Sequence, residues 1–352
     1  QYIMERRTFI KTAAAASVIS AVNPVFSLSK SSTTAAYSNE IIKPKRLNKG
    51  DTVGLIAPAG YLSENHIARS IEQLEMLDFK VVLSNNIRQK RGYLAGTDQQ
   101  RIDDIHEMFS RDDINAIFCA RGGYGSGRLL PYLDYELIKN NPKVLIGYSD
   151  ITALTYGIFV KTGLVCFHGL VTISTFNEFS VHNFNNVVMN PSDNYTYINA
   201  EEDPEDKELQ VYTITEGTAD GLLVGGNLSL IVAMIGTPYD IDTTGKIIFI
   251  EEIREEPYRI DRMLTQMRQA GKFEKAAGVA LGIFRRCDPA DKFEESLSLR
   301  DVLFDRLSDL GIPVIYGLSF GHVLNKFTFP IGINARLSTT DESVTLLESA
   351  VI

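Results

Sequence analysis

The sequence predicts an α/β protein built on a mostly parallel sheet, and two features of the chain carry this prediction. Short apolar runs of strand length alternate with longer segments in which apolar residues recur at helical spacing. With 352 residues, of which 44% are hydrophobic, the chain is long enough to bury the cores of about two domains. Alternation of this kind is typical of sheets whose strands are joined by helical crossovers.

The first predicted domain spans residues 43–185. Its strands are short apolar runs that end in turn-forming residues: TVGLIAPAG (52–60), KVVLSNN (80–86), AIFCA (116–120), VLIGYS (144–149) and LVCFHG (164–169). Residues 64–78 and 98–109 carry an apolar stripe at helical spacing between these strands. We therefore expect a sheet covered by helices in this domain.

A segment rich in Asn, Asp, Glu and Pro, residues 186–216, interrupts the alternation and is predicted to link two domains. The second domain, residues 217–352, resumes the alternation. Its predicted strands are KIIFIEE (246–252), GVALGIF (278–284) and PVIYGLSFG (313–321), and its predicted helices are residues 227–236, 257–270 and 299–310.

Charge and cysteine content argue against several classes of protein. The formal net charge is -9, and because residues 1–36 carry +3, the rest of the chain carries about -12. Such an acidic surface argues against a nucleic-acid partner and against docking on anionic lipid. The three cysteines, Cys119, Cys166 and Cys287, are too few and too widely spaced for a disulfide framework or a zinc pattern.

The first 36 residues are predicted to be a targeting segment. Arg6 and Arg7 precede Phe9-Ile10-Lys11 and a mild Ala-rich apolar stretch, which resembles a twin-arginine export signal followed by a flexible lead. The apolar stretch is too short for a stable transmembrane helix, and no other segment is long and apolar enough to span a membrane. We expect an exported protein with a periplasmic location.

A serine follows the fourth predicted strand, in the turn Gly147-Tyr148-Ser149-Asp150, and a helix is predicted to follow it. A serine at a strand-to-helix turn is held out from the sheet beside free backbone N–H groups, as a nucleophile requires. The alternative is that Ser149 or Asp150 simply caps the helix. Ile151 stands where the second glycine of a nucleophile elbow would be, which counts against a standard α/β-hydrolase.

The glycine-rich segment RGGYGSGR, residues 121–128, directly follows the third predicted strand. Four glycines in six positions indicate unusual backbone angles or a close backbone approach. Three uses remain open: a source of oxyanion-binding N–H groups, a phosphate cradle, or a plain tight turn. The spacing fits neither a dinucleotide-binding fingerprint nor a P-loop, so it does not favour nucleotide binding.

Two histidines, His168 and His322, lie at strand ends, where either is placed to act as a general base. Glu251 stands where the run KIIFI stops, and a carboxylate there can orient an imidazole. The neighbouring Glu252, Glu255 and Glu256 are expected to form a solvated acidic rim. Nucleophile, base, acid and oxyanion donors all fall at strand ends, so we expect them in a cleft between the two domains.

Taken together, these motifs resemble the LD-carboxypeptidase family, which includes the microcin-immunity carboxypeptidases. The matching segments are KGDTVGLIAPAG (49–60), RGYLAGTDQQR (91–101), CARGGYGSGRLLPYLD (119–134), LIGYSDITAL (145–154), LVGGNLSLIVAMIGTP (223–238), IIFIEEIREEPYRIDRML (247–264) and GLSFGH (317–322). The resemblance implies a flavodoxin-like N-terminal domain and a smaller swivelling α/β C-terminal domain. It also implies a homodimer that needs no metal and no cofactor.

The resemblance also assigns roles to residues. It implies a Ser149, Glu251 and His322 triad, and an oxyanion hole from the N–H groups of Asp150 and Gly123. The activity it implies is that of a muramoyltetrapeptide carboxypeptidase, which cuts the L,D amide before a terminal D-Ala of a murein tetrapeptide through an acyl-enzyme. Candidate substrate contacts, which are interpretations of the sequence, are Tyr124, Arg128 and Asn227.

Other functions remain open at this stage. A carboxypeptidase of the same family could act on a peptide antibiotic or another peptide amide. Two α/β domains around a cleft also describe exported ligand-binding proteins without catalysis, and a serine nucleophile also fits an ester hydrolase. Turnover of a defined L,D-tetrapeptide, of p-nitrophenyl esters, or of neither, separates these hypotheses.

Overall fold

The computed structural model describes residues 40–289 and 295–352. The predicted export signal, residues 1–36, lies outside these described residues. The described residues form one compact unit, within which two sheets carry two lobes. A continuous apolar core includes Phe118 of the first sheet and Phe249 of the second. No helix within the described ranges is both long and apolar enough to cross a bilayer.

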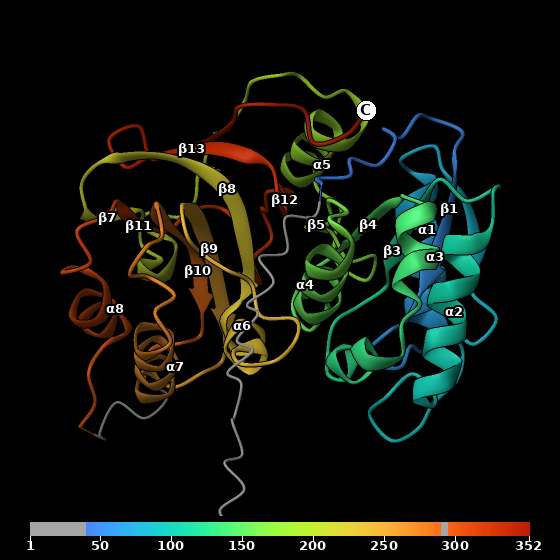
Figure 1. Cartoon of the computed structure of the whole chain (residues 1–352), viewed down its shortest axis with the longest axis horizontal. Helices are drawn as coiled ribbons and strands as arrows, with labels where there is room; N and C mark the ends of the chain where they lie inside the picture. The colour runs from blue at the N-terminus through green and yellow to red at the C-terminus, as the bar shows by residue number, and fades with distance from the viewer. Residues whose placement is uncertain (1–39, 290–294) are drawn as a thin grey trace, which may run out of the picture. The chain divides into compact units, whose positions relative to one another are not determined.

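The first sheet has six strands in the order β12-β5-β4-β3-β1-β2 (Figure 1). Five of them run parallel, and only the short β12 is antiparallel to its neighbour β5. The strands are β1 Thr52–Ile56, β2 Lys80–Leu83, β3 Ala116–Cys119, β4 Val144–Gly147, β5 Phe167–His168 and β12 Phe329–Pro330. The order β2-β1-β3-β4-β5 is that of flavodoxin-like sheets, so the predicted fold class is confirmed.

Four helices join the parallel strands of this lobe: α1 Glu64–Glu75, α2 Asp98–Ser110, α3 Tyr135–Asn140 and α4 Ile151–Thr162. A fifth helix, α5 Glu178–Phe184, follows β5 and continues into the π-helical turn Asn185–Met189. Reciprocal capping boxes at Ser63 and Thr97 fix the starts of α1 and α2. α4 is buried on almost every side because it packs between its own sheet and the second lobe (Figure 1).

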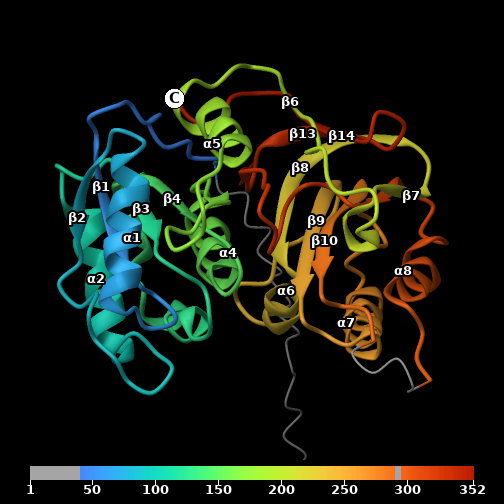
Figure 2. The same ribbon diagram turned by 180° about the vertical axis from the view of Figure 1, so that it is seen from behind.

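The second sheet has eight strands in the order β6-β14-β13-β8-β9-β10-β11-β7 (Figure 2). Its centre, from β8 to β11, is parallel. The strands are β6 Tyr195–Tyr197, β7 Tyr212–Thr215, β8 Thr218–Asn227, β9 Lys246–Ile253, β10 Gly278–Arg285, β11 Val314–Tyr316, β13 Asn334–Ser338 and β14 Ser343–Leu346. Its helices are α6 Leu228–Met234, α7 Pro257–Gln269 and α8 Leu299–Leu307.

The connections between the lobes go beyond the prediction, which allowed for one short strand in the linker. The predicted linker, residues 186–216, supplies both edge strands of the second sheet, β6 and β7, so part of it belongs to that sheet. The C-terminal part of the chain returns to the first lobe, where β12 pairs with β5. The domain boundaries themselves stay a prediction.

Candidate active site

Ser149 follows β4 directly and has a backbone φ of 67°, in the left-handed region that a serine rarely adopts. Its carbonyl accepts the N–H of Thr152 at 2.9 Å, which closes the first turn of α4. Neither Ser149 nor Asp150 caps this helix through its side chain, so capping does not explain the serine. The strained turn instead leaves the Ser149 side chain half-exposed at the carboxyl edge of the sheet.

The glycine-rich loop lies against the Ser149 hydroxyl. A Cβ at Gly122 would stand 2.7 Å from Ser149 Cβ, 2.9 Å from Ser149 Oγ and 3.2 Å from the backbone nitrogen of Asp150. Gly123, the predicted oxyanion donor, has a φ of 122° and packs against Gly60. The close approach therefore needs glycine at residue 122, and the identity of the second oxyanion donor stays a prediction.

Two anchors hold this loop in place. The Ser126 N–H donates to Asp150 Oδ2 at 2.8 Å, and the Ser126 hydroxyl donates to the Asp150 carbonyl at 2.5 Å. On the other side the buried Arg101 donates to the carbonyls of Pro58 at 2.6 Å and Gly125 at 2.9 Å. Arg101 also pairs with Asp98 at 2.5 Å, which offsets the cost of burying the guanidinium. The role of Arg101 was not predicted from the sequence, because an arginine on a helix is normally solvated.

The second lobe contributes a carboxylate–imidazole pair. Glu251 Oε2 lies 2.7 Å from His322 Nδ1, and the Glu251 side chain is fully buried. Burial opposes ionisation of Glu251, but its interactions with His322 outweigh burial and hold the pKa below its usual value. Because Glu251 engages Nδ1, Nε2 is the ring nitrogen left for proton transfer.

The pair lies next to the turn that holds Ser149. The His322 ring is 4.9 Å, centroid to centroid, from the ring of Tyr148, the residue that precedes Ser149. In the described part of the chain no hydrogen bond joins Ser149 to His322. Hydrogen bonds of this kind often tighten only when substrate is bound. The structure thus brings the three predicted residues into one neighbourhood, and their action as a triad stays a prediction.

His168, the other candidate base, is buried in an aromatic cluster. Its ring is 5.4 Å from that of Phe249 and 6.0 Å from that of Tyr148, and its Nε2 makes no hydrogen bond. Burial lowers the pKa of His168 to about 4, so the ring is neutral near pH 7. The carboxylate orients His322 and not His168, which favours His322 as the base.

The expectation of a solvated rim was wrong for Glu252, whose side chain is only 3% exposed. Its carboxylate accepts Asn227 Nδ2 at 2.9 Å, the Ser229 N–H at 2.8 Å and the Ser229 hydroxyl at 2.7 Å. β9 is a central strand of the sheet and is buried on both faces. The side chains of Glu251 and Glu252 therefore point to opposite faces, and both are buried. Burial raises the pKa of Glu252.

Asn227 links the two lobes. Its backbone N–H donates to Thr152 Oγ1 of α4 at 3.0 Å, and a Cβ at the preceding Gly226 would meet the same threonine at 2.6 Å. Because Asn227 Nδ2 donates to Glu252, this side chain is already engaged. The contact fixes the end of β8 against the first turn of α4, one turn beyond Ser149.

The other predicted substrate contacts border a cavity of about 450 Å³ that Asp150 also lines. Tyr124 is 55% exposed and packs edge-on against Tyr93, with ring centroids 5.6 Å apart. Arg128 forms a two-pronged ion pair with Asp98, at 2.7 Å and 3.0 Å. It is therefore not a free cation for a substrate carboxylate.

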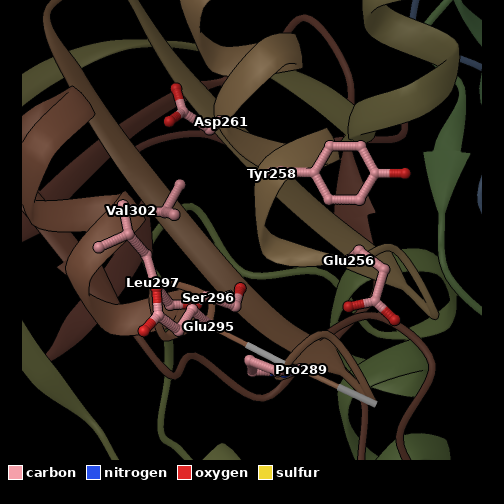
Figure 3. Close-up of a pocket in the computed structure, with 8 residues that line it drawn as sticks. All are labelled: Glu256, Tyr258, Asp261, Pro289, Glu295, Ser296, Leu297 and Val302. Carbon is pink, nitrogen blue, oxygen red and sulfur yellow. Dashed lines mark hydrogen bonds between the residues drawn. The ribbon is translucent and has the colours of Figure 1, made fainter. Parts of the chain in front are cut away.

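A second hollow, of about 580 Å³, lies beside α7 and α8 (Figure 3). It is lined by Glu256, Tyr258, Asp261, Pro289, Glu295, Ser296, Leu297 and Val302. None of the predicted site residues is among these. Within the described ranges, no group of three or more His, Cys, Asp or Glu side chains is placed to hold a metal ion.

Comparison with known proteins identifies the family. Residues 53–169 match the LD-carboxypeptidase N-terminal domain, and residues 220–337 match the LD-carboxypeptidase C-terminal domain. The chain belongs to the LD-carboxypeptidase family. Its similarity extends over most of its length, which agrees with the order of the motifs in the sequence.

Individual relatives of this LD-carboxypeptidase support the assignment. A probable murein peptide carboxypeptidase of Bacillus subtilis is 42% identical over 308 residues, covering 86% of this chain and 94% of the relative. The murein tetrapeptide carboxypeptidase of Pseudomonas aeruginosa is 31% identical, covering 81% and 92%. The structure of MccF, the microcin C7 self-immunity protein, in complex with glutamyl sulfamoyl guanosine superposes with a TM-score of 0.80 at 26% identity, covering 88% of this chain and 99% of that one.

Proposed function

We propose that this family member is a serine-type LD-carboxypeptidase that removes the terminal D-amino acid, D-Ala, from a murein tetrapeptide. One observation carries the serine-type chemistry. A strained serine with φ 67° follows β4, near a carboxylate–imidazole pair from the other lobe whose carboxylate is buried. Murein peptides are named as substrates for two of the relatives, which supports the choice of substrate.

In the proposed mechanism, His322 Nε2 accepts the proton of the Ser149 hydroxyl as Ser149 Oγ bonds to the carbonyl carbon of the L,D amide. The ionised Glu251 stabilises the imidazolium that forms. The carbon–nitrogen bond then breaks, and His322 returns its proton to the leaving amine of D-Ala. A water molecule, deprotonated by the same imidazole, then attacks the carbonyl carbon of the Ser149 ester. The bond between that carbon and Ser149 Oγ breaks, His322 returns the proton to Oγ, and the shortened peptide leaves as a carboxylic acid.

The tetrahedral oxyanion is proposed to bind to the N–H groups of Asp150 and Gly123. Asp150 follows Ser149 at the start of α4, where free N–H groups favour developing negative charge. Gly123 follows Gly122, whose added Cβ would stand 2.7 Å from Ser149 Cβ. Losing one such donor raises the barrier by about 3–4 kcal/mol. The anchors at Ser126 and Arg101 preorganise the loop that supplies the second donor.

The deciding experiment is mass spectrometry of a defined L-Ala–D-Glu–diamino acid–D-Ala peptide after incubation with the enzyme. We expect release of D-Ala alone, with no release by Ser149→Ala at unchanged thermal stability. Full release by that variant would rule out serine chemistry. A second experiment uses an aminoacyl nucleotide analogue, because one of the structural relatives, MccF, was solved with glutamyl sulfamoyl guanosine. Cleavage of that compound alone would assign an antibiotic substrate.

We also propose export through the Arg6-Arg7 segment to the periplasm, and assembly as a homodimer. Fractionation of cells expressing the wild type and a variant with both arginines replaced by lysine tests export. Light scattering coupled to gel filtration tests the dimer, and a mass of one chain would contradict it.

A further inference from the structure

Two lysines are buried among the described residues, and one of them has an evident structural role. Lys143, 8% exposed, donates to the carbonyls of Met108, at 3.1 Å, and Arg111. These carbonyls lie at the C-terminal end of α2, where the helix dipole favours a positive charge. Helix termination therefore accounts for the burial of Lys143.

Lys326 is more deeply buried and lacks such an explanation. It is 4% exposed and lies four residues after His322, in the segment before β12. Among the described residues its ammonium has one acceptor, the carbonyl of Leu324 at 3.5 Å, which is the limit of a hydrogen bond. Its backbone N–H donates to Ser180 Oγ at 3.1 Å, which fixes the segment on α5. Buried ammonium groups are normally paired, so this one needs a reason.

The surroundings of Lys326 connect it with the active site. Its Nζ lies 5.6 Å from the centroid of the Tyr148 ring, and that same ring lies 4.9 Å from His322. The titratable groups facing this neighbourhood are Glu251 of β9, His168 of β5 and His322. Burial lowers the pKa of Lys326 to about 8 against the opposing charge of Glu251, so the ammonium is largely protonated near pH 7.

The charges of the cluster of four groups, Glu251, His168, His322 and Lys326, balance in only one state. Glu252 points to the opposite face of β9, where Asn227 and Ser229 donate to it. Near pH 7 Glu251 is negative, Lys326 is positive and His168 is neutral, so the cluster is neutral when His322 carries no charge. Protonation of His322 would leave the cluster at +1. Without Lys326, the cluster would instead be neutral when His322 is protonated. A low-dielectric interior disfavours net charge, so the ammonium favours the uncharged imidazole.

We propose that Lys326 is a positioning residue of the catalytic base, whose positive charge keeps His322 in the free-base form that can accept the Ser149 proton. This inference rests on the proposed function, because it acts through His322. Glu251 orients the imidazole but also favours its charged form, and the charge of Lys326 offsets that second effect.

The direct test is an NMR titration of the His322 ring in the Ser149→Ala background, which needs no turnover. A unit charge about 10 Å away in a medium of effective dielectric about 20 shifts a pKa by about one unit. We therefore expect Lys326→Met to raise the pKa of His322 by about one unit. Lys326→Arg keeps the charge and should titrate like the parent. Lys143→Met is the matched control: it removes the other buried lysine and should leave the His322 titration unchanged.

The kinetic test uses the pH profile of kcat/KM for the tetrapeptide and for its C-terminal amide. In Lys326→Met the acidic limb should move up by about one pH unit for both substrates, an activity loss of about tenfold on that limb. The inference would be overturned if the His322 titration were the same in Lys326→Met as in the parent. It would also be overturned if the His322 titration shifted as much in Lys326→Arg as in Lys326→Met. A loss confined to the free acid would overturn it too, because it would place Lys326 on the substrate carboxylate. If the wild type releases no D-Ala, the proposed function fails, while the NMR titration still decides the role of Lys326.

Discussion

Replacement of Gly122 by alanine tests whether the glycine-rich loop must approach the nucleophile. The added Cβ would stand 2.7 Å from Ser149 Cβ and 2.9 Å from Ser149 Oγ, closer than such carbon atoms pack, so the loop or the serine must move. Gly122 is not among the residues with positive φ, so alanine adds a steric conflict and no backbone strain. We expect the fold to persist and the active site to be displaced.

The magnitude follows from what the displacement removes. Loss of one oxyanion donor lowers kcat by about 10²–10³-fold, and a shifted Ser149 adds to that loss. Steady-state kinetics on the tetrapeptide should show this fall in kcat in Gly122→Ala, with thermal unfolding close to that of the wild type. The matched control is Gly127→Ala in the same loop, where the new Cβ would meet its nearest atoms at 3.5 Å and 3.6 Å, ordinary packing distances. Near-wild-type kcat in Gly122→Ala would refute the close approach of the loop to Ser149.

Three further substitutions test other parts of the structure. Glu251→Gln should lower kcat by about 10³–10⁴-fold with little change in KM, because the amide no longer stabilises the imidazolium; a loss below tenfold would speak against its role. The folded-state pKa of His168 is about 4, below its ordinary value of 6.5, so the unfolded chain binds this proton first and stability is lost as pH falls. Between pH 7 and pH 4 the free energy of unfolding, measured with urea, should fall by about 3 kcal/mol less in His168→Phe than in the wild type. Arg101→Met should lower the free energy of unfolding by about 2–3 kcal/mol, because two buried carbonyls lose their donor. Arg128, the more exposed partner of the same Asp98, supplies the control: Arg128→Met should change the free energy of unfolding little.

The positions of the chemical groups could be predicted because they lie at strand ends. Within each sheet the parallel strands place their carboxyl ends on one edge. Ser149 after β4, Glu251 near the end of β9 and His322 after β11 were therefore expected to face a cleft between the two domains. The 2.7 Å contact of Glu251 with His322 and the closeness of His322 to Tyr148 agree with that expectation. The positive φ of Ser149 could not be predicted from the sequence. The predicted strand-to-helix turn indicates a tight connection there, but it does not specify the backbone angle.

Other features depend on tertiary packing and could not be predicted. Glu252 was predicted to be exposed because two adjacent glutamates end an apolar run. It is buried because β9 is a central strand and both faces of that strand are covered. Arg101 and Lys326 are long polar residues whose burial is set by loops that are distant in sequence. β12 is a two-residue strand with a proline, too short for any periodicity, and its pairing with β5 comes from the return of the chain to the first lobe.

The central claim is that a hydroxyl of the first lobe is activated by an imidazole of the second. Labelling with a serine-directed fluorophosphonate, followed by peptide mapping, measures this activation at the atom concerned. We expect stoichiometric modification of Ser149 in the wild type, and labelling slowed by several orders of magnitude in His322→Ala and Glu251→Gln. Modification at another residue, or equal labelling rates in all three proteins, would contradict the claim.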